Sequence, residues 1–210
     1  MAALAPPFHI AIFCRPLIAG RVKTRLIAAY DAQGATRIYE QLVERTLRTV
    51  AATEATASLW VAGDITHNSV TDWAQRYALL VYAQCEGDLG GRMSHCLATL
   101  AEKHQRVLLI GTDCPALTPE HLHAAAATLS ESCHWVFTPA EDGGYVLVGS
   151  NAPSTEPFKN VAWSTSEVMM QTRNALRTNA LVWAETAMLW DVDEATDVER
   201  ARRLALIDTR

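Results

Sequence analysis

The sequence predicts a three-layer α/β/α fold with a mixed, mostly parallel sheet, because short apolar runs alternate with amphipathic segments along its 210 residues. The clearest strand is Val107–Ile110, whose four apolar residues run directly into Gly111, Thr112 and Asp113. Such a run is typical of a parallel strand covered on both faces, and ligands bind these sheets beyond the carboxyl ends of the strands. We therefore expect Asp113 in a binding site, although a cap before Pro115 explains the residue equally well.

Composition limits the class of protein. Residues 1–210 are expected to form one domain, since no linker or charge block divides them. The net charge of −5 argues against nucleic acid as the main partner. No stretch is long enough to span a membrane and residues 1–7 do not resemble a signal peptide, so we expect a cytoplasmic protein. The five cysteines form no C-x-x-C pair, which favours reduced thiols over a zinc site or disulfides.

A basic loop follows the first predicted strand, Phe8–Phe13. Gly20 permits close backbone approach to a ligand, and several cations supply positive charge, so the loop is a candidate phosphate site. Its spacing matches neither a Walker A loop nor a G-x-G-x-x-G fingerprint, and a solvated basic turn is the alternative. The cations are Arg15, Arg21, Lys23 and Arg25.

The middle of the chain continues the alternation. Gln33–Val50 is expected to be an amphipathic helix, because its apolar side chains recur at helical spacing. Thr118 and Pro119 open a later helix as N-cap and first-turn proline. The other expected elements here are a strand at Ala57–Ala62, a helix at Val70–Tyr77 and a strand at Ala78–Ala83.

Two glycine-rich turns carry charged residues. Gln84–Met93 opens a helix, whose unpaired N–H groups attract anions, so Asp88, Gly90 and Arg92 are candidates to frame a nucleotide. A turn with Asp88 as N-cap is the alternative. The second turn joins the strands Trp135–Ala140 and Val146–Gly149, and its Asp-Gly-Gly sequence predicts a hairpin that also suits close approach to a sugar or base. Its residues are Glu141, Asp142, Gly143, Gly144 and Tyr145.

The C-terminal third adds a second acidic motif. An S-x-x-E capping box in Trp163–Glu167 predicts a helix from about Thr165 to Asn179. A short strand is expected at Leu181–Trp183. Asp191 and Asp193 then share one side of an extended segment before the last helix, where their carboxylates are suited to a divalent cation. Acids before helices are also common caps, so the pair alone is weak support for a metal site.

Six motifs, taken together and in order, resemble one bacterial family. It comprises the small GT-A-like transferases often described as arsenosugar-biosynthesis glycosyltransferases, which are related to guanylyl- and other nucleotidyltransferases of the nucleotide-diphospho-sugar transferase fold. The motifs are Arg15-Pro16 with Gly20–Leu26, Gly87–Met93, Gly111–Pro115, Pro139–Tyr145, Trp163–Thr165 and Asp191–Asp193.

The resemblance implies a Rossmann-like GT-A fold and a set of roles. Lys23 and Arg25 would bind phosphates, together with Arg15, Gly20, Asp88 and Arg92. Asp113 and Asp193 would bind Mg²⁺ or Mn²⁺. Asp142, Gly143, Gly144 and Tyr145 would face the acceptor.

Two positions depart from the pattern of the family. Gly91 stands where an acid is usual, and Asp193-Glu194-Ala195 stands where Asp-Thr-Pro is usual. The second change removes a preferred cap and a first-turn proline, so we expect weaker entry into the last helix rather than weaker metal binding.

The implied chemistry is displacement at an activated nucleotide, with Lys23 and Arg25 stabilising the leaving group. The first hypothesis is glycosyl transfer from a nucleotide sugar to a small-molecule acceptor, with Asp142 orienting or deprotonating its hydroxyl. The second is nucleotidyl transfer from a nucleoside triphosphate to a phosphorylated acceptor, with release of pyrophosphate. The third is a nucleotide-binding protein without catalysis, against which the intact Lys23, Asp113 and Asp193 argue. The sequence leaves the oligomeric state open.

Overall fold

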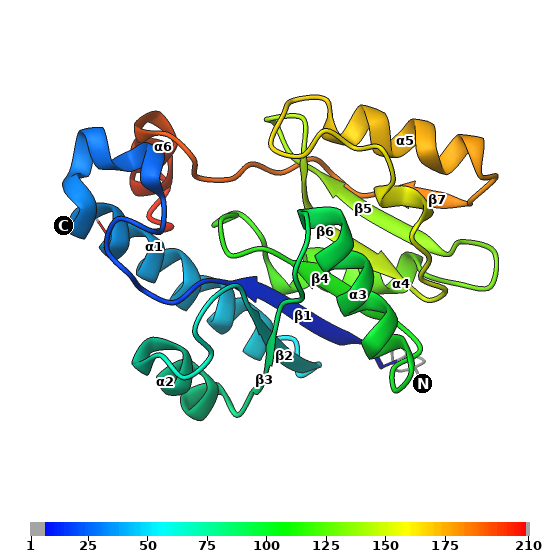
Figure 1. Cartoon of the computed structure of the whole chain (residues 1–210), viewed down its shortest axis with the longest axis horizontal. Helices are drawn as coiled ribbons and strands as arrows, with labels where there is room; N and C mark the ends of the chain where they lie inside the picture. The colour runs from blue at the N-terminus through cyan, green and yellow to red at the C-terminus, as the bar shows by residue number, and fades with distance from the viewer. Residues whose placement is uncertain (1–6, 209–210) are drawn as a thin grey trace.

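A computed structural model describes residues 7–208 and contains a seven-stranded mixed sheet. The strand order is β3-β2-β1-β4-β6-β5-β7, and only β6 pairs antiparallel with its neighbours, β4 and β5. The predicted mixed, mostly parallel sheet is therefore confirmed (Figure 1). The strands are β1 (His9–Cys14), β2 (Thr56–Val61), β3 (Leu80–Ala83), β4 (Val107–Ile110), β5 (Trp135–Pro139), β6 (Tyr145–Ser150) and β7 (Trp183–Glu185).

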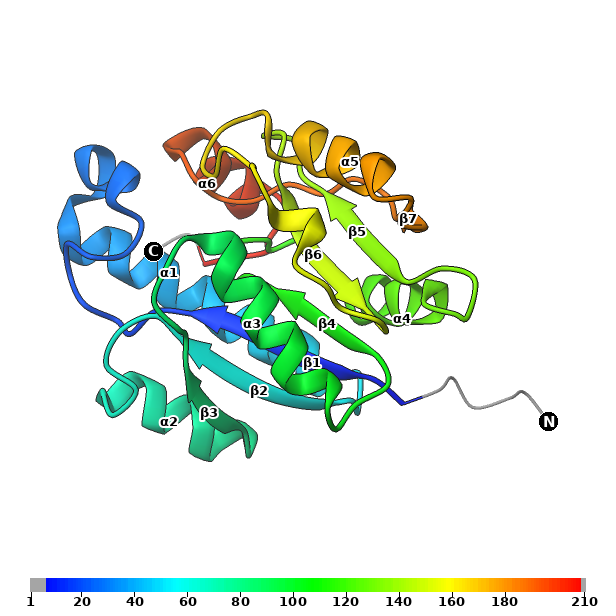
Figure 2. The same cartoon turned by 45° about the vertical axis from the view of Figure 1, so that its right-hand side comes forward.

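Helices cover both faces of the sheet and make the three layers that the alternation predicts. Apolar side chains of α1 (Ile27–Ala51), α2 (Asn68–Tyr77) and α4 (Pro119–Thr128) form a core on one face. Those of α3 (Leu89–Ala101), α5 (Val168–Thr178) and the short 3₁₀ helix η2 (Glu156–Phe158) form a core on the other. In Figure 2, α3 crosses in front of the sheet while α4 lies behind it.

The period of two along β1 explains how one strand serves both cores. Ile10 and Ile12 point into the core beneath α1, whereas Ala11 points into the core beneath α3, and all three are fully buried. Strand β4 is buried along its whole length, as its continuous apolar run predicts.

The last helix, α6 (Ala195–Arg203), packs at the start of α1. Val198 and Ala201 contact a third apolar cluster that includes Leu26 of the 3₁₀ helix η1 (Thr24–Leu26) and Ile38 of α1. This packing brings the C-terminal acidic segment beside the basic loop that follows β1 (Figure 1).

Local capping confirms one prediction and corrects two. Thr118 caps α4 with Pro119 in its first turn, as predicted. The capping box expected in Trp163–Glu167 is absent there: α5 begins only at Val168, and Ser164 has a left-handed φ of 65° rather than the extended backbone of an N-cap. The last helix is well capped despite its unusual sequence, since Glu194 and Asp197 form a capping box.

Several boundaries also shift. The strand expected at Leu181–Trp183 lies at Trp183–Glu185, and the third strand begins at Leu80 rather than Ala78. Within residues 7–208, no helix is both long and apolar enough to cross a membrane.

Candidate active site

A large cleft opens at the edge of the sheet where the parallel strands end. Its volume is about 1120 Å³, and its walls come from the loops after β1 and β4, the β5–β6 turn and the segment before α6. Because β6 runs antiparallel, its first residues meet the last residues of β4 and β5 at this edge. The fold thus gathers these four parts of the chain around one volume, together with the start of α3 and the segment 163–168.

Most of the predicted site residues line this cleft. Gly20, Asp88, Gly90 and Gly143 do not. Gly20 adopts a φ of 80° in the basic loop, and Asp88 is the N-cap of α3, where its side chain accepts the Gly91 N–H at 2.8 Å. The predicted residues that line the cleft are Arg15, Lys23, Arg25, Arg92, Asp113, Asp142, Gly144, Tyr145 and Asp193.

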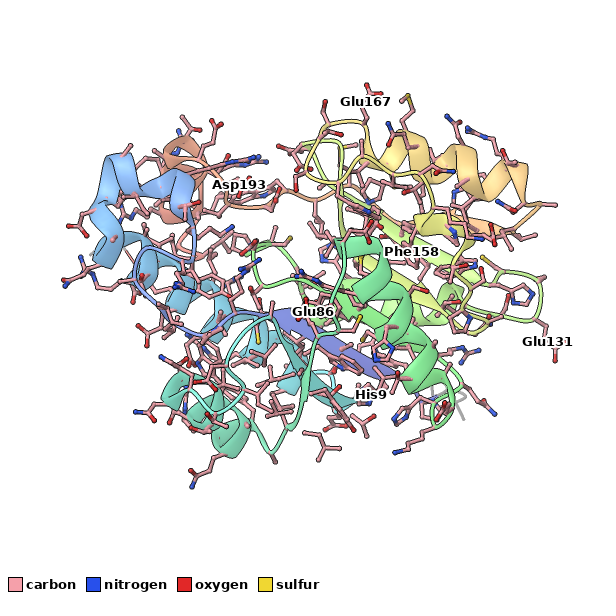
Figure 3. The ribbon with its side chains drawn as sticks, in the orientation of Figure 1. His9, Glu86, Glu131, Phe158, Glu167 and Asp193 are labelled. Atoms are coloured by element: carbon pink, nitrogen blue, oxygen red, sulfur yellow. The ribbon has the colours of Figure 1, made fainter. Side chains whose placement is uncertain are left out.

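Lys23 lies between the two aspartates that the sequence assigns to a metal. Its Nζ is 2.9 Å from Asp113 Oδ2 and 3.5 Å from Asp193 Oδ1. Arg25 forms a further salt bridge with Asp193. Figure 3 labels Asp193 on the segment that leads into α6. Lys23 and Arg25, which the sequence assigns to phosphates, therefore contact the acids of the same cleft in this structure.

The charges of the cleft perturb one another. Burial alone would lower the pKa of Lys23, but Asp113, Asp193 and Asp191 outweigh it and raise that pKa. Burial and the neighbouring carboxylate of Asp142 raise the pKa of Asp191 to about 6, against the opposing effect of Lys23. Asp191 is thus part of the cluster, and the D-x-D spacing is the sequence signal that places it there.

The donor set fits a hard divalent cation bound through few protein ligands. Asp113 Oδ1 is buried and has no hydrogen-bond partner among the described residues, so a water molecule or a ligand is needed to satisfy it. Carboxylate oxygens suit Mg²⁺ and Mn²⁺, and Mg²⁺ usually takes one or two carboxylates together with substrate phosphates and water. Among residues 7–208, no group of three or more Asp, Glu, His or Cys side chains is placed to hold a metal ion.

Tyr39, which lies in the helix predicted at Gln33–Val50, holds two loops of the cleft together. Its hydroxyl accepts the backbone N–H of Arg15 at 2.8 Å and the Thr112 hydroxyl at 3.4 Å. Tyr39 lies on α1 and is buried, and burial raises the pKa of its phenol. The loops after β1 and β4 are therefore fixed relative to each other.

The β5–β6 turn positions Asp142 at the cleft. Its Oδ1 accepts the Gly144 N–H at 2.8 Å, which orients the carboxylate. Gly143 has a φ of 90°, and a Cβ there would lie 2.1 Å from the carbonyl oxygen of Ser166. Tyr145 lines the cleft, but its hydroxyl lies 3.9 Å from Met93 Sδ, inside the protein.

Gly90 and Trp163 explain why two distant motifs occur together. A Cβ on Gly90 would lie 2.6 Å from the Trp163 ring, so only glycine lets the start of α3 pack against this indole. Trp163 lines the cleft, and so does Arg92, which lies on α3. The sequence marks both motifs, but not their contact.

The comparisons with known proteins place the chain in a fold class. A family model described as "Uncharacterized protein conserved in bacteria (DUF2064)" matches residues 46–165, more than half of the chain. No curated protein matches it. A "putative nucleotide-diphospho-sugar transferase" from Desulfovibrio desulfuricans G20 is similar over 94% of this chain and 87% of its own, with 25% identity and a TM-score of 0.85.

Two more distant structures share the fold. The 4-diphosphocytidyl-2C-methyl-D-erythritol synthase of Anaerococcus prevotii DSM 20548 has a TM-score of 0.62 at 11% identity, over 96% of both chains. Glucosyl-3-phosphoglycerate synthase of Mycobacterium tuberculosis, in complex with Mn²⁺, UDP-glucose and phosphoglyceric acid, has a TM-score of 0.55 at 9% identity, over 95% of this chain and 76% of its own. The predicted GT-A-like fold, which is the fold of such transferases, is thereby confirmed.

Proposed function

This chain belongs to the bacterial DUF2064 family, and we propose that it is a transferase that takes its donor as an activated nucleotide. We further propose that it transfers a glycosyl group from a nucleotide sugar to a small-molecule acceptor. One observation carries the proposal. Two cations, Lys23 and Arg25, form salt bridges with two acids of the same cleft, Asp113 and Asp193. We also take residues 1–210 as one domain, since a single sheet supports the walls of that cleft.

Phosphate binding is assigned to the cations of the cleft. Arg15, Arg21 and Arg25 are exposed on the basic loop, and Arg92 is held on α3, where its Nε donates to the carbonyl of Gly87 at 3.0 Å. Guanidinium groups match phosphate oxygens in pairs, so this set suits a diphosphate donor. Lys23 adds charge where the leaving group departs.

The acids of the cleft are assigned to the cation and the acceptor. Asp113 and Asp193 would hold Mg²⁺ or Mn²⁺, which neutralises phosphate charge when it is bound. Asp142 is oriented by Gly144 and exposed, so it can accept the proton of an acceptor hydroxyl. The solved relative that contains Mn²⁺ and UDP-glucose supports this assignment by analogy.

Nucleotidyl transfer from a nucleoside triphosphate is the second candidate. The observation that favours it is the number of cations on one loop, since Arg15, Arg21, Lys23 and Arg25 all line the cleft and suit a longer phosphate chain. The cytidylyltransferases among the solved structures share the fold at about 11% identity, which does not distinguish the two reactions.

A thermal-shift panel followed by product analysis tests both reactions. Nucleoside triphosphates, diphosphates and nucleotide sugars are added with and without Mn²⁺, and a ligand at a hundredfold excess over its Kd should stabilise the protein by about 2.7 kcal/mol. We expect the largest Mn²⁺-dependent shift with a nucleotide sugar, and release of a nucleoside diphosphate on turnover. Release of pyrophosphate from a triphosphate would establish nucleotidyl transfer instead, and no shift with any ligand would refute both.

A further inference from the structure

Lys23 places a positive charge among the acids that we assign to the cation. Its Nζ contacts Asp113 and Asp193, and its side chain is only 5% exposed, whereas those of the two aspartates are 42% and 40% exposed. The ammonium group therefore lies on the protein side of the carboxylates, which open toward the cleft.

The loop holds Lys23 firmly in this position. Its backbone is left-handed, with φ 45° and ψ 47°, which is unusual for a residue with a Cβ. Val22 and Leu26 on either side are buried, so the loop is anchored in the core. Movement of Lys23 away from the aspartates is thus confined to its flexible side chain.

A divalent cation and this ammonium group would share the same two carboxylates. Two cations at neighbouring positions repel each other strongly when water is partly excluded. A lysine side chain is ordinarily charged at neutral pH, and here its ammonium group contacts two carboxylates. A divalent cation can bind the carboxylates of both Asp113 and Asp193 only if the ammonium group of Lys23 moves away from them.

We propose that Lys23 is an internal competitor of the divalent cation, and that donor phosphates relieve the competition by drawing its ammonium group away from Asp113 and Asp193. This inference rests on the proposed function of the cleft. It implies that the cation binds weakly to the free protein and tightly once the phosphates are present. Because coupling between two ligands is reciprocal, the cation strengthens donor binding by the same factor.

Removal of Lys23 should therefore tighten cation binding to the protein alone. Direct contact between cation and phosphate also produces cooperative binding, but it does not predict this effect. To measure this effect, Mn²⁺ is titrated into Lys23→Met in the absence of nucleotide. Electron paramagnetic resonance reports the concentration of free Mn²⁺. We expect the Kd for Mn²⁺ to fall roughly tenfold or more relative to the native chain.

Arg21→Met is the matched control, because it removes one positive charge from the same cleft while both salt bridges of Lys23 remain. It should tighten Mn²⁺ binding only about twofold to threefold, as expected for a screened charge. Equal changes in the two variants would show a general field effect and overturn the inference. Unchanged or weaker Mn²⁺ binding to folded Lys23→Met would also overturn it.

A second measurement uses the native protein, in case Lys23→Met does not fold. Acetic anhydride labelling and mass spectrometry compare Lys23 with the exposed Lys103 and Lys159. We expect saturating Mn²⁺ alone to increase the labelling of Lys23 severalfold while the other two stay constant. Bound Mn²⁺ without any change at Lys23 would refute the competition. Neither measurement uses a nucleotide, so each outcome is independent of whether the proposed donor is correct.

Discussion

The backbone N–H of Val192 donates to the carbonyl of Asp113 at 2.9 Å. This bond ties the segment before α6 to the loop after β4, and it joins the residue between Asp191 and Asp193 to Asp113. Val192 is fully buried, so the attachment is anchored in the core. Asp113 and Asp193, which come from distant parts of the chain, thereby lie close enough for both to contact Lys23.

Substitution of Asp113 tests the role of that cluster in turnover. Asp113→Asn keeps the size of the side chain but removes its charge, so the cation and Lys23 both lose a partner. We expect the variant to lose roughly 3–4 kcal/mol of transition-state stabilisation, and turnover to fall accordingly. Turnover is measured at saturating donor and Mn²⁺, with folding checked by circular dichroism.

Asp72→Asn is the control for this variant, since Asp72 is exposed on α2 and forms a surface salt bridge with Arg76. Such pairs contribute about 0–1 kcal/mol to stability. Turnover of Asp113→Asn equal to that of the control would remove Asp113 from the mechanism.

Asp142 is expected to act on the acceptor rather than on the donor. Asp142→Asn keeps an oxygen for the Gly144 N–H, so the turn is retained while the base is lost. We expect turnover to fall by roughly 10²- to 10⁴-fold with little change in nucleotide affinity. Loss of nucleotide affinity at unchanged turnover would move Asp142 to the donor side of the cleft.

Elements whose signals are local were predictable from the sequence. The buried run of β4, the Asp-Gly-Gly hairpin and the Thr118-Pro119 cap each depend on neighbours in the chain, and each was found where expected. The capping box in Trp163–Glu167 failed for a tertiary reason, because the chain there folds into a turn that packs against Gly143.

The pairing of Lys23 with Asp113 and Asp193 could not be predicted from local sequence patterns. Residue types and motif order indicated that all three belong to one site, but a lysine and two acids can equally face separate ligands. The packing of α6 against the start of α1 and the hydrogen bond from Val192 to Asp113 bring them together. Tyr39 shows the same limit, since its helical spacing marks it as core and conceals the hydroxyl that joins two loops.

Gly143 should be essential for stability. Gly143→Ala forces a side chain into a left-handed backbone and against the carbonyl of Ser166, so we expect a loss of about 2–4 kcal/mol in the free energy of unfolding. Urea denaturation measures it. Gly111→Ala is the control, because a Cβ there meets nothing within 4 Å, and its stability should change by less than about 1 kcal/mol. Similar losses in both variants would contradict the steric argument.

The pH dependence of stability should show that folding disfavours the ionised form of Asp191. Its pKa is raised from 3.8 to about 6 in the folded protein, so folding favours the protonated form. The contribution of this group to stability is present below pH 4 and is lost as the pH rises through about 6. Asp191→Asn cannot ionise, and we therefore expect it to be more stable than the native chain at pH 8, by up to about 3 kcal/mol.

Urea denaturation at pH 8 and pH 4.5 checks this expectation, and the gain should shrink at the lower pH. Asp193→Asn provides the contrast two residues away, because it removes a salt-bridge partner of Lys23 and Arg25 and should destabilise the protein at pH 8. Opposite signs for the two variants would show that burial dominates at Asp191 and ion pairing at Asp193. A loss of stability in Asp191→Asn at pH 8 would instead mean that its ionised form is stabilised in the cleft.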